Sequence, residues 1–134
     1  MTNKTKFGLF VRPVRDLMTV SEFAKNAEDL GFDSLWSGEH LAFYTPTFDS
    51  LTLMAVCAGA TKKIELGTAI LLMPLRHPAW VQKSLTTLDY ASGGRSILGI
   101  GIGGAYEKEF ETVNVPVRER GARTDEGLEL LKKL

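Results

Sequence analysis

The stretch IELGTAILLMPLRHPAWVQKSLTTLDYASGGRSILGIGI, Ile64 to Ile102, decides the fold. Apolar runs at 64–73 and 96–102 flank a segment in which apolar residues recur with helical spacing. Pro78 stands where the first helical residue is expected, and Gly93-Gly94 follow the last turn. Both runs are apolar on two faces, as strands of a covered parallel sheet are. The stretch therefore predicts two parallel strands joined by a helix.

The same strand–helix alternation extends over the rest of the chain. We expect further strands at 6–11 and 34–37, and further helices at 19–30, 49–61 and 118–134. Thr19 and Glu22 form a capping box at the start of the first helix. The repeat of about 30 residues matches a βαβ unit and predicts one parallel α/β domain over residues 1–134. Periodicity alone leaves open whether the sheet is open or part of a barrel.

Composition excludes several classes of partner. Sixteen Lys and Arg residues balance sixteen Asp and Glu residues, which gives no support to a nucleic-acid or anionic-membrane partner. No window approaches the ~20 apolar residues of a membrane span, and the first residues lack the apolar core of a signal peptide. The single cysteine, Cys57, excludes an intramolecular disulfide and is expected in the core. We expect a cytoplasmic protein without a metal site.

Polar or flexible residues follow each expected strand. They are Arg12 after the first strand, Glu39 and His40 after the second, Arg76 and His77 after the third, and Gly99, Gly101, Gly103 and Gly104 at the end of the fourth. Because the carboxyl ends of parallel strands share one edge, functional groups gather there. The sequence therefore predicts a site at this rim. His77 directly precedes Pro78, so we expect it to cap the helix rather than to contact a ligand.

The glycine cluster in LGIGIGG, residues 98–104, has three interpretations. It contains the G-x-G of a dinucleotide fingerprint, but the segment at 105–116 lacks the clean helix which that fingerprint needs. Strand glycines can also serve tight packing inside a small barrel. In the third interpretation, the backbone lies against a flat ring where a Cβ atom would collide.

Three segments together carry a resemblance to a known family: AEDLGFDSLWSGEH, ATKKIELGTAILLMPLRHPAWVQKSLTTLDYASGGRSILGIGIGG and VPVRERGARTDEGLELLKKL. They resemble the amino-terminal half of the bacterial-luciferase-like superfamily of flavin- and coenzyme F420-dependent oxidoreductases, and its F420-dependent branch most of all. The resemblance implies a (β/α)8 TIM-type barrel about twice this length, of which the chain is a parallel (β/α)4 half. It also implies hydride transfer between a (deaza)flavin and a small organic substrate.

Two alternatives accompany this reading. The first is an FMN-dependent luciferase-like monooxygenase that uses reduced flavin and oxygen, and the second is a non-catalytic half-barrel scaffold. The resemblance implies coenzyme F420 in preference to FMN. The cofactor contacts that it implies are Thr68, Ala69, Ile70, Arg76, Gly101, Gly103 and Gly104, with a cis peptide bond at Ala69–Ile70.

His40 is the implied catalytic residue, because a neutral imidazole suits proton transfer near neutral pH. Its alternative is a loop histidine bonded to local backbone, and Glu39 would either orient His40 or cap the loop. F420-dependent relatives often carry a glutamate directly after the fourth-strand glycines, where this chain has Gly104 and Ala105. The proton donor is therefore left open between His40, no enzyme acid and no catalysis.

The last residues, GLELLKKL, still carry a helical pattern without a stop signal. Four parallel strands alone leave two unpaired edges and an open inner face. We therefore expect either a fragment of a longer protein or a chain that a second copy completes. In the second case the chain would form a homodimer or a larger assembly, joined strand to strand.

Overall fold

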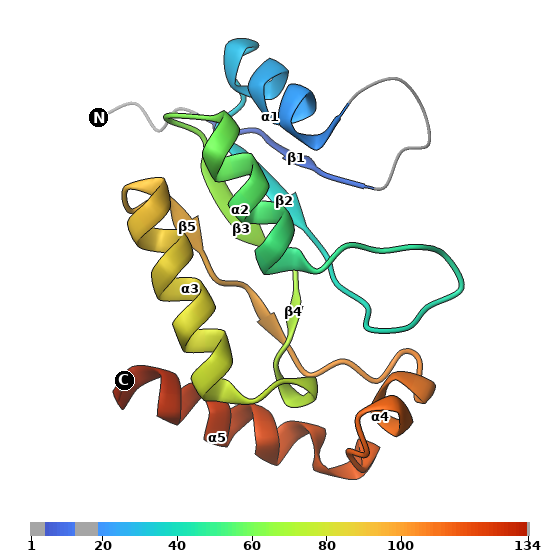
Figure 1. Cartoon of the computed structure of the whole chain (residues 1–134). Helices are drawn as coiled ribbons and strands as arrows, with labels where there is room; N and C mark the ends of the chain where they lie inside the picture. The colour runs from blue at the N-terminus through green and yellow to red at the C-terminus, as the bar shows by residue number, and fades with distance from the viewer. Residues whose placement is uncertain (1–4, 13–18, 134) are drawn as a thin grey trace.

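The computed structural model describes residues 5–12 and 19–133, and its centre is a parallel four-stranded sheet in the order β1-β2-β3-β5 (Figure 1). A second parallel pair, β4-β6, continues the third and fourth of these strands. The strands are β1 (Gly8–Phe10), β2 (Ser34–Ser37), β3 (Glu65–Thr68), β4 (Leu71–Leu72), β5 (Ser96–Ile97) and β6 (Ile100–Gly101). The α-helices are α1 (Val20–Asp29), α2 (Ser50–Ala60), α3 (Pro78–Ser92), α4 (Lys108–Thr112) and α5 (Arg120–Lys133), with 3-10 turns η1 (Met73–Leu75) and η2 (Val117–Glu119). The predicted parallel α/β fold is confirmed.

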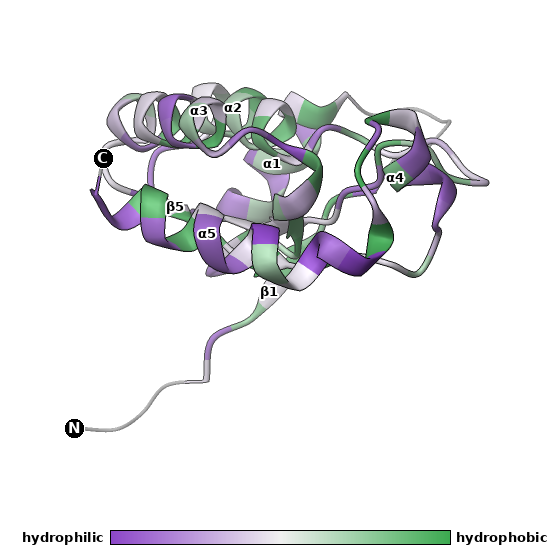
Figure 2. Ribbon diagram, turned by 90° about the horizontal axis from the view of Figure 1, so that it is seen from below, coloured by the Kyte–Doolittle hydropathy of each residue, from purple (hydrophilic) through white to green (hydrophobic). Residues whose placement is uncertain are grey.

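Helices α1, α2 and α3 pack side by side along one face of the sheet (Figure 1), and Figure 2 shows α2 and α3 adjacent in one layer. Side chains that alternate toward this layer, such as Leu35 and Leu66, are fully buried. They form the core together with residues of α2, including Met54 and Cys57. Cys57 is fully buried in this core, as predicted, and burial raises the pKa of its thiol to about 11.

The opposite face of the sheet, here called the inner face, carries the register row Phe10, Trp36, Gly67 and Ile97. Trp36 lies across Gly67, where an added Cβ would come 2.3 Å from the indole ring. Phe10 and Ile97 remain 44% and 37% exposed. The inner face is thus apolar and open to solvent at both ends of this row.

The helix starts agree with the sequence signals. The capping box is present, since Glu22 N donates to Thr19 Oγ1 at 3.2 Å and Thr19 N donates to Glu22 Oε2 at 2.7 Å. His77 caps α3 as predicted, because its Nδ1 accepts from Ala79 N at 3.3 Å. Helix α3 ends at Gly93, which adopts φ +74°.

The third and fourth strands differ from prediction because each is divided in two. The third breaks at the Ala69–Ile70 peptide, which is cis, and this confirms the geometry that the family resemblance implied. Opposite this break, Thr68 Oγ1 donates to Gly99 O at 2.8 Å and accepts from Gly99 N at 3.0 Å. A side-chain hydroxyl therefore satisfies both backbone groups of Gly99 where the strand ladder is interrupted.

The segment after the glycines also differs from prediction. It contains the short helix α4, and the last helix begins with a 3-10 turn and becomes α-helical only at Arg120. The final residue of the predicted helix, Leu134, lies outside the described residues. Among the helices within 5–12 and 19–133, none combines the length and apolar character needed to cross a bilayer.

Candidate functional site

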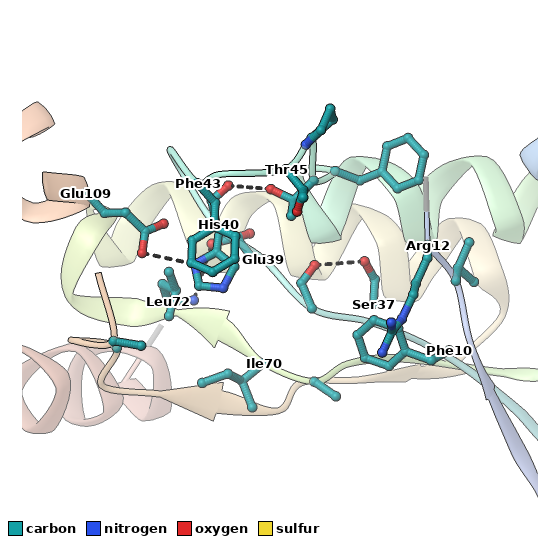
Figure 3. Close-up of a pocket in the computed structure, with 18 of the residues that line it drawn as sticks. Phe10, Arg12, Ser37, Glu39, His40, Phe43, Thr45, Ile70, Leu72 and Glu109 are labelled. Atoms are coloured by element: carbon teal, nitrogen blue, oxygen red, sulfur yellow. Dashed lines mark hydrogen bonds and ion pairs between the residues drawn. The ribbon is translucent and has the colours of Figure 1, made fainter. Parts of the chain in front are cut away.

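A cavity of about 1100 Å³ opens at the carboxyl ends of the strands, at the predicted rim (Figure 3). The residues that line it come from the ends of β1 and β2, from the loop after β2, from the β3–β4 junction and from the segment after β6. Of the predicted site residues, the cavity lining includes Glu39, His40, Ala69, Ile70, Gly103 and Gly104.

One side of this cavity, here called the shelf, is formed by Ala69, Ile70, Gly103 and Gly104. Gly103 and Gly104 adopt φ values of +65° and +108°, a backbone conformation that L side chains rarely adopt. The shelf therefore presents backbone at the two glycines, a methyl group at Ala69 and the exposed side chain of Ile70. An added Cβ at Gly103 would meet the side chains of Leu72 and Phe110, and one at Gly104 would meet Arg120. The two glycines therefore fit the second interpretation, tight packing, and they also leave backbone in the cavity lining.

His40 faces the same cavity and is held from two directions (Figure 3). Its Nδ1 atom lies 3.0 Å from Oε2 of Glu109, a side chain that is only 1% exposed. Its ring stacks on Phe43, with centroids 3.9 Å apart and planes 8° apart. The other carboxylate oxygen of Glu109 accepts from Leu41 N at 2.6 Å and from Ala42 N at 3.4 Å.

This contact assigns the proton on the imidazole. A carboxylate that already accepts two backbone N–H groups acts as an acceptor toward His40, so Nδ1 of His40 carries the proton. In the neutral ring, Nε2 is then the free acceptor, on the edge away from Glu109. His40 can take a proton from a ligand at Nε2 and return it, while Glu109 stabilises the charged ring.

Glu39 serves a different network, and the expectation that it orients His40 is wrong. Its carboxylate accepts from Arg76 Nε at 3.0 Å, Arg76 Nη2 at 2.8 Å, Ser50 Oγ at 2.8 Å and Leu72 N at 3.2 Å. Arg76 also pairs with Asp49, the residue that caps α2. Glu39 therefore ties the loop after β2 to α2 and to β4, and the carboxylate beside His40 is Glu109.

The charges in this network shift each other's titration. Burial would lower the pKa of Arg76, but hydrogen bonds to Glu39 and Asp49 outweigh it and raise the pKa. Burial would raise the pKa of Asp49, but hydrogen bonds from Thr52 and Arg76 hold it below its ordinary value of 3.8. Both directions favour the ionised pair, which indicates a structural anchor.

Three predicted cofactor contacts lie outside the cavity lining: Thr68, Arg76 and Gly101. Thr68 is 2% exposed, and its hydroxyl is hydrogen-bonded to Gly99. The guanidinium of Arg76 forms ion pairs with Glu39 and Asp49. Gly101 lies under Ile70, where an added Cβ would come 1.7 Å from Ile70 Cδ1. These three residues support the shelf and its surroundings instead of facing the cavity.

The two side chains that hold His40, Glu109 and Phe43, were not predicted. Glu109 lies in α4, a helix that the sequence pattern did not indicate, next to the fully buried Phe110. The available signal in the sequence was an aromatic residue, Phe110, next to Glu109 within a mostly polar segment, because such an aromatic residue is expected to be buried. Within the described part of the chain, no group of three His, Cys, Asp or Glu side chains could hold a metal ion.

Parallel βα units with a ligand-sized cavity at the carboxyl rim define part of a TIM-type barrel. The chain belongs to the luciferase-like monooxygenase family, whose sequence model matches residues 5–134. This confirms the family resemblance. Solved structures of luciferase-like TIM-barrel enzymes match the chain over 30–42% of their own length, so the predicted half-barrel fold is confirmed as well.

The relatives include proteins named for dependence on F420 and proteins named as monooxygenases. The chain is 35% identical to an F420-dependent glucose-6-phosphate dehydrogenase of Kineococcus radiotolerans, over 86% of this chain and 36% of that protein. It is 29% identical to the 4-hydroxyprotoasukamycin monooxygenase of Streptomyces nodosus subsp. asukaensis, over 98% of this chain and 38% of that protein. The chain thus spans less than two fifths of the length of either relative.

Solved structures of both kinds of protein match the chain. The coenzyme F420 dependent tetrahydromethanopterin reductase of Methanopyrus kandleri is 31% identical, with a TM-score of 0.67 over 83% of this chain and 30% of that one. The monooxygenase RslO1 of Streptomyces bottropensis is 28% identical, with a TM-score of 0.82 over 96% of this chain and 42% of that one.

Proposed function

We propose that the chain is the cofactor- and substrate-binding half of an oxidoreductase that transfers hydride between a (deaza)flavin and a small organic substrate. Coenzyme F420 is the preferred cofactor and FMN the alternative. The observation that carries the proposal is the geometry of the cavity, in which the shelf and His40 face one space (Figure 3). Relatives named for F420 dependence support the choice of cofactor.

The shelf residues fit a planar ring. Gly103 and Gly104 bring backbone to the cavity with no side chain in between, and Ala69 contributes only a methyl group. Ile70 is 41% exposed and lies over Gly101, so its side chain offers an apolar surface at the rim. When bound, the cofactor supplies the hydride chemistry, which no side chain can perform.

His40 handles the proton in this proposal. Its Nε2 atom accepts or donates a proton at the substrate, since Nδ1 is committed to Glu109. Glu109 is buried and fixed by Leu41 N, so it can stabilise the imidazolium form without leaving its place. Phe43 covers one face of the imidazole, which fixes the plane of the ring and keeps water from that face.

A second candidate is an FMN-dependent monooxygenase that uses reduced flavin and oxygen. Gly104 and Ala105 provide no carboxylate at the position where the family resemblance implies a glutamate for F420-dependent members. The likeness to the 4-hydroxyprotoasukamycin monooxygenase over 98% of this chain supports this candidate too. A non-catalytic scaffold is the remaining alternative.

Fluorescence titration of the purified chain with F420 and, separately, with FMN tests these candidates. Binding of F420 without FMN supports hydride transfer, and FMN binding with oxygen-dependent NADH consumption in the presence of a flavin reductase supports the monooxygenase. Binding of neither cofactor would refute both and leave the scaffold. The Ala105→Phe variant should weaken cofactor binding, because Ala105 is exposed and lines the cavity. The matched control Ala91→Phe, at an exposed position of α3 outside the cavity lining, should not.

A further inference from the structure

We propose that the substrate of this site is a neutral, largely apolar organic molecule, and that polyhydroxylated phosphates such as sugar phosphates are poor ligands. The inference rests on the proposed function, because it assigns the substrate class of the same cavity. It matters because the named relatives include both a glucose-6-phosphate dehydrogenase and a monooxygenase. The inference rests on which side chains of the cavity are still free to contact a ligand: most of them are apolar.

The cavity has room for a second molecule beside a flat cofactor ring. Its volume of about 1100 Å³ exceeds the roughly 300–1000 Å³ of ordinary ligand pockets. The shelf takes up one side, and residues of β1, of the loop after β2 and of the segment after β6 form the rest. A substrate would therefore contact the surfaces outside the shelf.

The cavity lining outside the shelf includes five apolar side chains, which we call the apolar wall: Phe10, Phe43, Pro46, Phe48 and Ile102. Three aromatic rings in one wall favour an apolar body, and a flat one in particular, because ring faces and edges pack against planar groups. Phe10 and Ile102 are 44% and 46% exposed, so they present apolar area that a ligand can remove from water.

The position of Phe43 within the wall is fixed by a cluster of rings. Its ring stacks on His40 and lies 5.0 Å from the Tyr44 ring and 5.8 Å from the Tyr106 ring, centroid to centroid. Tyr44 and Tyr106 in turn contact each other at 4.8 Å. Rings from the loop after β2 and from the segment before α4 therefore pack around Phe43 and keep it beside the imidazole of His40.

Most polar groups that line the cavity are already bonded within the protein. Ser37 Oγ donates to Gly38 O at 3.0 Å, and Thr47 Oγ1 donates to His40 O at 2.9 Å. The carboxylates of Glu39 and Glu109 are occupied as described above. A sugar would need several free donors and acceptors in the wall, and those available here are few.

A phosphate group would also need several cationic or N–H donors. Among the described residues that line the cavity, Arg12 is the only one with a permanent positive charge. Its guanidinium lies 5.5 Å from the centroid of the Phe10 ring, where it borders the apolar wall. One such cation suits a single oxygen of an otherwise apolar ligand better than a doubly charged phosphate.

Calorimetric titration of the purified chain with 2-naphthol and with glucose 6-phosphate tests the inference. We expect 2-naphthol to bind and glucose 6-phosphate to bind at least tenfold more weakly. The Ile102→Ser variant should weaken 2-naphthol binding roughly fivefold to tenfold, because it removes apolar contact area. The matched control is Ile97→Ser, which changes an inner-face isoleucine of similar exposure, 37%, that does not line the cavity.

Three results would overturn the inference: tighter binding of glucose 6-phosphate than of 2-naphthol, equal loss of 2-naphthol binding in both variants, or no binding of either probe. The cofactor titration described above, run on the same protein, keeps the two proposals apart. If neither F420 nor FMN binds but 2-naphthol does, the proposed function fails. If a cofactor binds and glucose 6-phosphate is the better ligand, only the substrate class fails.

Discussion

Replacing Glu109 with glutamine keeps the shape of the side chain but turns one acceptor oxygen into a donor amide. The remaining oxygen can still accept from Leu41 N, which lies 2.6 Å from the carboxylate. The new amide group then faces Nδ1 of His40, which lies 3.0 Å from the replaced oxygen. Two N–H groups would point at each other unless His40 moves its proton from Nδ1 to Nε2.

The magnitude follows from the burial of this contact. Glu109 is 1% exposed and His40 28% exposed, so water can replace the lost hydrogen bond only in part. A buried donor left without its partner costs about 1–3 kcal/mol, and we expect the free energy of unfolding to fall by that amount. If the proton moves instead, the stability loss is smaller, but Nε2 no longer offers an acceptor to the cavity.

The assay is a long-range ¹H–¹⁵N NMR correlation of the imidazole rings, which distinguishes the two neutral forms. The chain has only two histidines, and His77 serves as an internal reference. Its Nδ1 accepts from Ala79 N, so its proton belongs on Nε2. We expect opposite forms for His40 and His77 in the original chain and the same form in Glu109→Gln.

Two results would refute this reasoning. One is a His40 ring that already carries its proton on Nε2 at neutral pH in the original chain. The other is a Glu109→Gln variant that leaves both the form of His40 and the free energy of unfolding unchanged. Either result would mean that the carboxylate does not determine where the imidazole proton lies.

Four further predictions concern the frame of the site and the assembly. Arg76→Met should lower the free energy of unfolding by about 3 kcal/mol in urea titration, because it leaves the buried Glu39 without its cation. Gly99→Ala should cost more stability than Gly101→Ala: the first added Cβ meets a backbone carbonyl at 2.1 Å, and the second meets a mobile side-chain end. In Asp49→Asn, the free energy of unfolding should fall less between neutral and acidic pH than it does in the original chain. The folded-state pKa of Asp49 lies below 3.8, so its contribution is complete above about pH 4 and is lost as the pH falls through the folded-state pKa. Light scattering after size exclusion should show a dimer or larger species, since the inner face is apolar and open.

Each of these predictions has a contrary result. Lys6→Met is the control for the arginine variant, because Lys6 and Glu65 form a pair whose side chains are 67% and 40% exposed, and its loss should cost under about 1 kcal/mol. An equal effect of both methionine variants would contradict the anchor role. Equal stability of Gly99→Ala and Gly101→Ala would contradict the second prediction. The third would be contradicted by Asp49→Asn losing as much stability in acid as the original chain, and the fourth by a stable monomer in light scattering.

The βα units could be read from the sequence because their signals are local. Apolar periodicity, the Thr19 capping box and Pro78 each act within a few residues, and the predicted ranges 34–37 and 78–92 coincide with β2 and α3. The break in the third strand lies at the cis Ala69–Ile70 peptide, which only the family resemblance indicated, and the contact beside it joins Thr68 and Gly99, which lie 31 residues apart. No local pattern specifies such a contact.

The site was predicted in its position and only partly in its contacts. Parallel topology places the strand ends together, so His40, Ala69, Ile70 and the last two glycines could be expected at one rim. The partner of each charged group could not, because Glu109 reaches His40 across 69 residues and Arg76 reaches Glu39 across 37. Sequence adjacency suggested a pair of Glu39 with His40 that tertiary packing does not form.

Glu39 and His40 are neighbours along the chain but belong to different networks: the carboxylate of Glu39 binds Arg76, and the imidazole of His40 contacts Glu109 in the cavity lining. A deletion of a single residue just before them would place the imidazole where Arg76 needs a carboxylate, and Leu41 where the imidazole faces the cavity. A change of length on either side of this pair would therefore disturb one network or the other, because Leu41 N and Ala42 N also hold Glu109 beside the imidazole.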